Sequence, residues 1–171
     1  MKINSISITS QASLDFELKG AKPITILRGK NSSLALDLIR EVIGERNFSC
    51  EQVDVDGGHF IIHTEVEMGE KNYSVCYSRN AESDGDNRIA VNFKPRSVEF
   101  SRADTMEFLE KSNETTAADR PVFIYPSTLG DKNNVTAFIQ ALSGADRQVF
   151  VALPEDYSEI NHDNIMNVFV G

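Results

Sequence analysis

Apolar and polar residues alternate in two separate parts of the chain, which is the pattern of strands that bury one face. Near the start, Lys2–Thr9 and Ser13–Leu18 predict two strands that pair through a short turn. Further along, Phe60–Met68 and Lys71–Ser78 predict a hairpin, and Arg88–Phe93 predicts the strand that follows it. The sequence therefore predicts an antiparallel meander in the middle of the chain.

A different pattern follows the first two strands. The apolar run Pro23–Leu27 predicts a core strand that enters a loop, and apolar residues recur at helical spacing over residues 34–43. Ser32 or Ser33 is suited to be the N-cap of this helix, and Gly44 is suited to end it. This strand–loop–helix unit is the most informative local feature of the sequence.

The last third of the chain predicts alternating helices and strands. A short helix is expected over Thr105–Lys111, and the apolar run Val122–Tyr125 is typical of a strand buried on both faces of a parallel sheet. Gln148–Ala152 predicts a second buried strand, and Val168–Val170 predicts a last short one. The helix between the two buried strands has an apolar stripe made of Val135, Phe138, Ile139 and Leu142.

Together these elements predict one α/β domain over residues 1–171, with βαβ units and an antiparallel meander inserted into a mixed sheet. Three consecutive parts make up this domain. Residues 1–45 hold the strand–loop–helix unit, residues 46–100 hold the antiparallel section, and residues 101–171 hold the final strand–helix–strand unit.

Composition narrows the class of protein without naming an activity. The 17 basic and 26 acidic residues give a formal net charge of −9, which disfavours binding to nucleic acid by this chain alone. No run approaches the roughly 18 consecutive apolar residues of a membrane span, and the start does not resemble a secretory signal. A cytoplasmic protein without membrane contact is expected, with Cys50 and Cys76 as buried free thiols.

Several residues that could bind a ligand are better explained by ordinary structure. His59 and His63 lie about 13 Å apart if they are on one strand, which is too far for a shared metal ion. Asp54–Gly58 and Asp84–Asn87 lack a complete calcium-loop pattern and are typical of turns. Ser127 and Thr128 follow a predicted strand, where helix capping is favoured over ligand binding. No metal site is predicted.

Seven segments of the chain, taken together and in order, resemble the sequence of a known family, although no single segment is distinctive. They are Met1–Ile6, Leu14–Leu18, Ile24–Ser33 with Leu36–Arg40, Gly69–Tyr73, Arg120–Pro126, Leu129–Asp131 and Arg147–Ala152. In this order they resemble the ATPase heads of the ABC superfamily, especially the group of SMC and RecF-like proteins. The resemblance implies a fold like that of P-loop NTPases, with the helical subdomain that carries the signature motif largely absent.

The phosphate loop of such heads is incomplete in this chain. The motif G-x-x-x-x-G-K-[ST] supplies backbone N–H groups, a lysine and a metal-binding hydroxyl to the nucleotide phosphates. Here Gly29, Lys30, Asn31, Ser32 and Ser33 run directly into a helix, so the second glycine and the residues after it are missing. By resemblance, these five residues are the candidate nucleotide- or anion-binding residues. Lys30 is at the start of the loop, and a solvated loop lysine is the favoured interpretation.

The other catalytic motifs are also replaced. Tyr125 and Pro126 stand where the Walker B strand should end in Asp-Glu, and neither can bind Mg²⁺ or accept a proton at neutral pH. Asp131 occupies the position of the D-loop aspartate, and Leu153-Pro154 precedes the place of the switch histidine. Leu142–Ala145 resembles the signature motif only in its letters, because it follows the Walker B position instead of preceding it.

Phosphoryl transfer depends on positioned charge around the γ-phosphate, and here the charged groups are missing together. The sequence therefore predicts a catalytically degenerate ABC-ATPase-like protein that acts through contact with a protein, either a second copy or an active homologous ATPase. It is expected to have no enzymatic activity and no cofactor or metal. One alternative is a nucleotide- or anion-binding protein with weak affinity for ATP. Another is a small active ATPase or a DNA-repair accessory factor.

Overall fold

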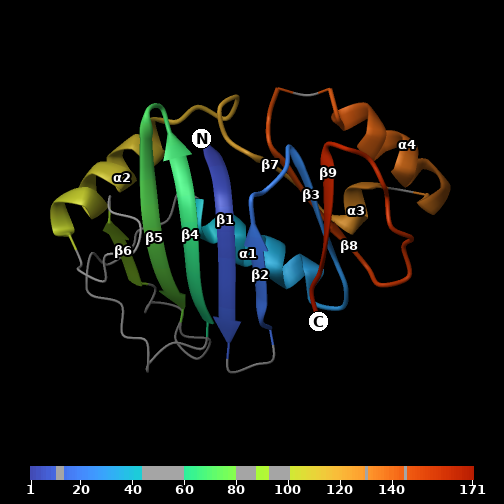
Figure 1. Cartoon of the computed structure of the whole chain (residues 1–171), viewed down its shortest axis with the longest axis horizontal. Coiled ribbons are helices and arrows are strands. Elements are labelled where there is room, and N and C mark those ends of the chain that lie inside the picture. Colours follow the sequence, from blue (N-terminus) through green and yellow to red (C-terminus); the bar gives the residue numbers. More distant parts are fainter. Residues whose placement is uncertain (11–13, 44–59, 80–87, 93–100, 130, 145) are drawn as a thin grey trace.

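The computed structural model describes residues 1–10, 14–43, 60–79, 88–92, 101–129, 131–144 and 146–171. These residues form a mixed α/β structure with two separate sheets (Figure 1). The strands are β1 (Lys2–Ser10), β2 (Phe16–Lys19), β3 (Ile24–Arg28), β4 (Phe60–Met68), β5 (Lys71–Arg79), β6 (Arg88–Asn92), β7 (Val122–Ile124), β8 (Val149–Leu153) and β9 (Ile165–Phe169). The helices are α1 (Ser32–Ile43), α2 (Arg102–Glu114), the single turn α3 (Pro126–Leu129) and α4 (Lys132–Leu142).

The first sheet is antiparallel, with strand order β2-β1-β4-β5-β6. The predicted hairpin is confirmed: Met68 lies opposite Lys71, and Gly69 in the turn has a φ of +63°, a conformation that suits glycine. A β-bulge lies between Ile3 and Ser5 of β1. Because the bulge inserts one residue, Ile3 and Ile6 face the core together although three positions separate them.

The second sheet is parallel, with strand order β7-β8-β3-β9. The sequence predicted parallel pairing for the apolar runs here, and this is confirmed. All five residues of β8 are buried, because β8 has a strand on each side and side-chain packing on both faces. The carboxyl ends of β3, β8 and β9 lie at the same edge of this sheet, since the strands are parallel.

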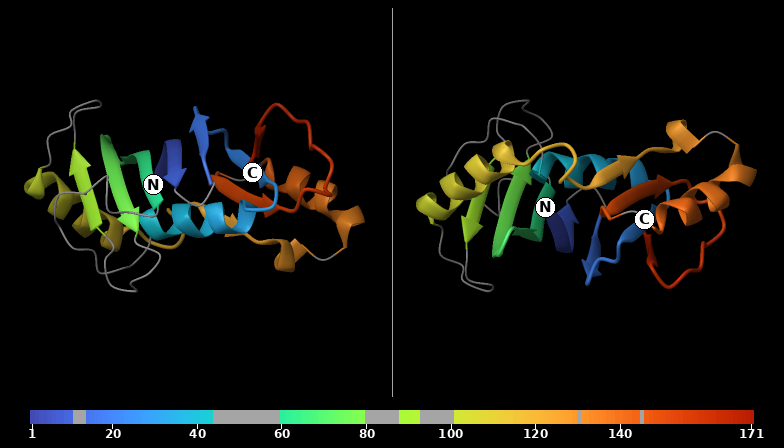
Figure 2. Two further views of the ribbon diagram at one scale, coloured as in Figure 1. Left: turned by 90° about the horizontal axis from the view of Figure 1, so that it is seen from below. Right: turned by 90° about the horizontal axis from the view of Figure 1, so that it is seen from above.

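Helix α1 joins the two sheets (Figure 2). Its buried residues belong to one core that also includes Tyr77 of the antiparallel sheet and Phe150 of the parallel sheet. Helix α2 lies against the antiparallel sheet, where Phe108 meets Tyr73 edge to face at 5.4 Å between ring centroids. A second core covers the other face of the parallel sheet, where α4 contributes Val135 and Ile139.

A single side chain also connects the two sheets at the β1 bulge. The Oε1 atom of Gln148 accepts a hydrogen bond from the backbone N–H of Ile3, and its Nε2 atom donates to the Ile3 carbonyl oxygen, both at 2.8 Å. Gln148 is buried and directly precedes β8. The amide therefore binds β1 as a residue of a neighbouring strand would, at a position that β2 does not reach.

The sheet arrangement differs from the prediction of one mixed sheet. Strands β1 and β2 pair with the meander strand β4, not with β3, so the antiparallel strands form a sheet of their own. The antiparallel part therefore includes strands from residues 1–45 as well as from the expected section 46–100. Strand β1 belongs there because its polar positions pair with those of β4 on one face while its isoleucines enter the core on the other.

Several element boundaries also differ. Helix α2 extends over Arg102–Glu114, because Ser101 caps it by accepting a hydrogen bond from the N–H of Asp104 at 3.2 Å. Strand β7 is at an edge of its sheet, so Val122 is only half-buried. Phe138, expected in the buried stripe of α4, is 43% exposed.

Some predictions concern residues outside those that the structure describes: the helix end at Gly44, the turns Asp54–Gly58 and Asp84–Asn87, and the side chains of Cys50 and His59. Among the described residues, no helix is both long enough and apolar enough to cross a membrane.

Candidate functional site

The predicted phosphate-loop residues lie at the carboxyl edge of the parallel sheet, the usual place for ligands in α/β folds. Strand β3 ends at Arg28, and α1 begins at Ser32, so Gly29–Asn31 form the whole connection. We call these residues the β3–α1 turn. The adjacent strands β8 and β9 bring Leu153 and Val170 to the same edge. The phosphate-loop hypothesis depends on the space and free N–H groups at this turn.

Three backbone N–H groups of this region, those of Gly29, Ser32 and Ala35, donate within the protein. The N–H of Gly29 donates to the Leu153 carbonyl oxygen at 3.0 Å, and the N–H of Ser32 donates to the Gly29 carbonyl oxygen at 3.2 Å. The N–H of Ala35 makes the ordinary helical bond to Asn31. A phosphate loop instead turns several such N–H groups toward one anion. The β3–α1 turn is therefore a tight, internally bonded connection.

The segment that follows β9 occupies the space beside Gly29. The N–H of Val170 donates to the Arg28 carbonyl oxygen at 2.6 Å, and Asn31 Nδ2 donates to the carbonyl oxygen of Gly171 at 2.5 Å. Gly29 has a φ of +133°, and a Cβ atom at this position would lie 2.0 Å from the Val170 carbonyl oxygen. Glycine is therefore required here by the close approach of Val170, a reason that the sequence did not reveal.

The remaining predicted loop residues do not form a phosphate cradle. Lys30 is exposed, whereas Ser32 is buried and Ser33 is half-buried at the start of α1. Counted from Gly29, the lysine and hydroxyl of a full motif would fall at positions 35 and 36. Ala35 and Leu36 stand there, and both are fully buried in the core. These two positions therefore carry apolar packing and offer no side chain to a phosphate or a metal ion.

The Walker B position is occupied by a contact between two elements. Tyr125 follows β7, and its hydroxyl donates to Asp37 Oδ1 on α1 at 2.6 Å. Burial and the hydrogen bond to Asp37 both raise the pKa of Tyr125, so its hydroxyl is protonated at neutral pH. Pro126 begins the short helix α3. The hydrogen bond between Tyr125 and Asp37 ties the end of β7 to α1. Neither Tyr125 nor Pro126 is a free general base.

Asp131, at the D-loop position, is exposed directly before α4, where its carbonyl oxygen accepts the N–H of Asn134 at 3.0 Å. Both further views place the start of α4 at the outer end of the molecule, away from the β3–α1 turn (Figure 2). The structure thus places the β3–α1 turn at the start of α1 and Tyr125 against Asp37 in the middle of that helix, and leaves Asp131 apart. Ser127 lies within α3, in one helical turn.

Arg28 is a residue at this edge that the sequence analysis did not single out. Its guanidinium donates to the Tyr157 carbonyl oxygen at 2.9 Å and to Glu159 Oε1 at 3.0 Å. Both partners belong to the connection of residues 154–164 between β8 and β9, which Asn167 also holds through a bond from Nδ2 to the Ile160 carbonyl oxygen. An arginine that ends an otherwise apolar strand is the feature that could have indicated this role.

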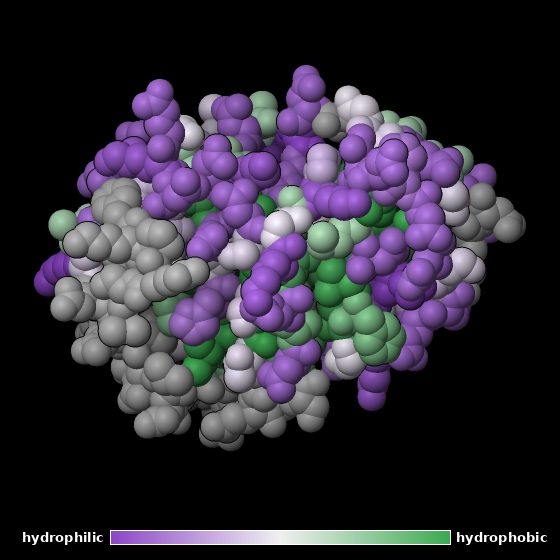
Figure 3. All heavy atoms as spheres, in the orientation of Figure 1, coloured by the Kyte–Doolittle hydropathy of each residue, from purple (hydrophilic) through white to green (hydrophobic). Residues whose placement is uncertain are grey.

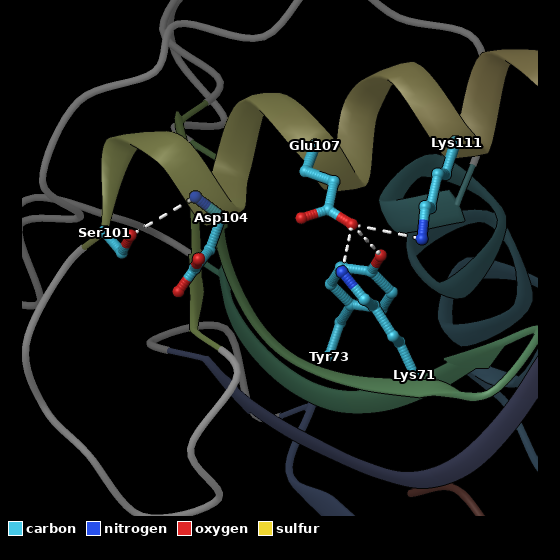
Figure 4. Close-up of polar contacts among 6 residues, drawn as sticks. All are labelled: Lys71, Tyr73, Ser101, Asp104, Glu107 and Lys111. Atoms are coloured by element: carbon cyan, nitrogen blue, oxygen red, sulfur yellow. Dashed lines mark hydrogen bonds and ion pairs between the residues drawn. The ribbon is translucent and has the colours of Figure 1, made fainter.

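Within the part of the chain that the structure describes, a cluster of charged contacts lies on the antiparallel sheet, far from the β3–α1 turn. Glu107 Oε1 on α2 accepts from Lys71 Nζ at 2.7 Å, Lys111 Nζ at 3.0 Å and the Tyr73 hydroxyl at 3.3 Å (Figure 4). Hydrogen bonds from Lys71 and Lys111 lower the pKa of Glu107 to about 2. Because one oxygen receives all three donors, this cluster fastens α2 to β5.

The geometry therefore offers no phosphoryl-transfer apparatus within the part of the chain that the structure describes. The same residues include no group of three or more histidine, cysteine or acidic side chains arranged to hold a metal ion. His63 is exposed on β4, as expected for a histidine on the solvent side of a strand. Cys76 is a free thiol on β5 and is partly buried. Comparison with known proteins found no matching family model and no matching curated protein.

Proposed function

We propose that this chain is a catalytically degenerate relative of ABC-type ATPase heads that works as a protein-interaction module. The observation that carries this proposal is the closed β3–α1 turn, with the backbone of Val170 packed against Gly29. The strand order supports it as well. Strand β8 lies between β3 and β7 and is parallel to both, so the phosphate-loop and Walker B positions are joined in one parallel sheet.

The replaced chemistry supports a role without hydrolysis. Tyr125 and Pro126 offer no carboxylate for Mg²⁺ or for the attacking water, and Ala35 occupies the lysine position. Each such charge contributes about 10³-fold or more to phosphoryl transfer. When all of these charged groups are replaced, none of these positions can stabilise the transition state of ATP hydrolysis.

An exposed apolar surface supports contact with a protein. Phe169 ends β9 at the same sheet edge as the β3–α1 turn and is 60% exposed. Figure 3 shows hydrophobic residues among polar ones on this face. Strand β9 is at an edge of the parallel sheet, and an edge strand offers its backbone to another chain. The proposed partner is a second copy of the chain or an active homologous ATPase.

The first experiment measures ATP hydrolysis with Mg²⁺ and the melting shift caused by millimolar ATP, ADP or GTP. The proposal predicts no turnover above background and no nucleotide-dependent shift. Lys30→Ala is compared with Lys19→Ala, which removes an exposed lysine paired with Glu17 on β2. Turnover that Lys30→Ala abolishes and Lys19→Ala preserves would overturn the proposal.

The second experiment tests the surface. Sedimentation equilibrium of the wild type is compared with Phe169→Ser, and with Phe138→Ser, which removes an exposed phenylalanine from α4. We expect Phe169→Ser alone to weaken association. A chain that is monomeric at all concentrations would contradict pairing with itself and point to the homologous ATPase as partner.

A second candidate function is weak anion binding at the N-terminus of α1. It is favoured by Lys30, whose exposed side chain lies one residue before Asn31 at the positive end of a 12-residue helix. Inorganic phosphate and ATP would then bind with similar affinity, because the site would contact a single phosphate group of either ligand. Calorimetry that gives heat with both anions, lost in Lys30→Ala, would support this function over the leading one.

A further inference from the structure

A cysteine and a histidine face each other across the hairpin of β4 and β5. The register places His63 opposite Cys76, and the distance between His63 Nε2 and Cys76 Sγ is 3.9 Å. The hairpin turn alone fixes this pairing, because each residue lies five positions from the residue that closes the turn. The sequence analysis compared His63 with His59 on the same strand, and so missed its partner on the next one.

The separation of the two donor atoms matches that of two ligands on one metal ion. With a metal–sulfur bond of about 2.3 Å and a metal–nitrogen bond of about 2.0 Å, the donors lie about 3.5 Å apart at a tetrahedral angle and about 4.3 Å apart in a linear arrangement. The observed 3.9 Å falls between these limits. A metal ion can therefore bind both atoms without movement of the strands.

An ion that binds both atoms would displace the thiol proton of Cys76, as thiol-binding metals do.

A small residue lies beside the pair on one side, because Ser7 of β1 is opposite His63. Among the residues that the structure describes, no third ligand joins the two. Soft ions with a preference for sulfur and nitrogen tolerate this set, whereas Mg²⁺ and Ca²⁺ require oxygen ligands.

We propose that Cys76 and His63 form a binding site for one soft metal ion, Zn²⁺ or Cu⁺, on the solvent side of the antiparallel sheet. The thiolate and the imidazole Nε2 bond to the ion, the thiol proton leaves to solvent, and water or an external ligand completes the coordination. The site is independent of the β3–α1 turn and of the proposed function.

The experiment titrates the protein with Zn²⁺ in calorimetry and, under reducing anaerobic conditions, with Cu⁺. All variants carry Cys50→Ser, which leaves Cys76 as the single thiol of the chain. Cys76→Ser and His63→Gln are compared with His162→Gln, which removes an exposed histidine whose Nδ1 accepts from the Asn164 N–H. Co²⁺ is added as a spectroscopic probe, because a thiolate bound to Co²⁺ gives a charge-transfer band.

We expect one equivalent of Zn²⁺ or Cu⁺ to bind, with release of a proton and a thiolate–Co²⁺ band. Cys76→Ser and His63→Gln should each weaken binding at least tenfold, while His162→Gln leaves it unchanged. Binding of Cu⁺ alone would indicate two-coordinate geometry, and binding of Zn²⁺ would indicate added water ligands. The proposal is overturned if neither ion binds at micromolar concentration, or if either ligand variant binds like the wild type. Melting curves of all variants exclude unfolding as the cause.

Discussion

The two sheets of this protein differ in the contacts that are made where their strands end. In the antiparallel sheet, a short turn joins β4 to β5, Lys71 beside that turn pairs with Glu107 of α2, and the solvent face carries polar residues. In the parallel sheet, the carboxyl edge is closed by contacts between residues that lie far apart in sequence, such as Gly29 and Val170. An edge that is normally open for ligands has become part of the packed structure. A ligand or partner at this edge must therefore bind to its outer surface, because the space between the strand ends is filled.

The largest expected effect comes from the closed edge. Gly29→Ala should lower the free energy of unfolding by about 3 kcal/mol or more, because the new Cβ meets the Val170 carbonyl oxygen and a positive φ is unfavourable for alanine. Gly20→Ala is the matched control, since Gly20 has a φ of +65° and nothing within 4 Å of a Cβ. It should cost about 1 kcal/mol. Chemical denaturation measures both, and equal losses would contradict the close approach of Val170.

The next effect tests the joint between the sheets. Gln148→Leu leaves the N–H and the carbonyl group of Ile3 without their partner in a buried position, and should cost about 2–4 kcal/mol. Gln148→Glu places a buried carboxylate oxygen against the Ile3 carbonyl oxygen, so urea denaturation at pH 7 should place it no higher in stability than Gln148→Leu. If Gln148→Leu is as stable as the wild type, the two sheets are held together by α1 alone.

A smaller effect is expected at the Walker B position. Tyr125→Phe removes the hydrogen bond to Asp37 and should cost about 1 kcal/mol, since both groups are partly solvated. The titration of Tyr125 in the wild type, followed by its absorbance, should lie above pH 10 because burial and Asp37 raise its pKa. An ordinary titration midpoint would mean that Tyr125 does not face Asp37.

The smallest effect concerns the antiparallel sheet and depends on pH. The pKa of Glu107 is lowered from 4.5 to about 2 in the folded protein, so its ionised form stabilises the fold above pH 4.5. This contribution is lost as the pH falls from 4.5 toward 2. Glu107→Gln should therefore be less stable than the wild type at pH 7, and the two should converge near pH 2 in thermal unfolding. A difference that is independent of pH would contradict this account.

Local patterns were enough to predict most elements. The alternation in β4 and β5 and the glycine between them define the hairpin, and the apolar runs of β3 and β8 predict parallel strands. The separate antiparallel sheet was not predicted, because the partner of β1 is decided by β4, which follows more than fifty residues later. Alternation indicates that a strand has two different faces, but it does not indicate which strand lies beside it.

The candidate site was predicted only in part. The short β3–α1 connection and the Tyr125-Pro126 pair after β7 could be predicted from the sequence, because each is a local pattern. The occupation of the turn by Val170 is not visible, since these residues are about 140 positions apart and no periodicity links them. The pairing of His63 with Cys76 could have been derived from the hairpin turn alone.

The Gln148 amide has a mechanical consequence. It substitutes for a peptide group beside Ile3, at the bulge where β2 has already ended. A rotation of one sheet against the other would pull the amide away and expose both peptide groups of Ile3 to an apolar surrounding without water. Rotation of one sheet against the other therefore carries the cost of two unpaired peptide groups.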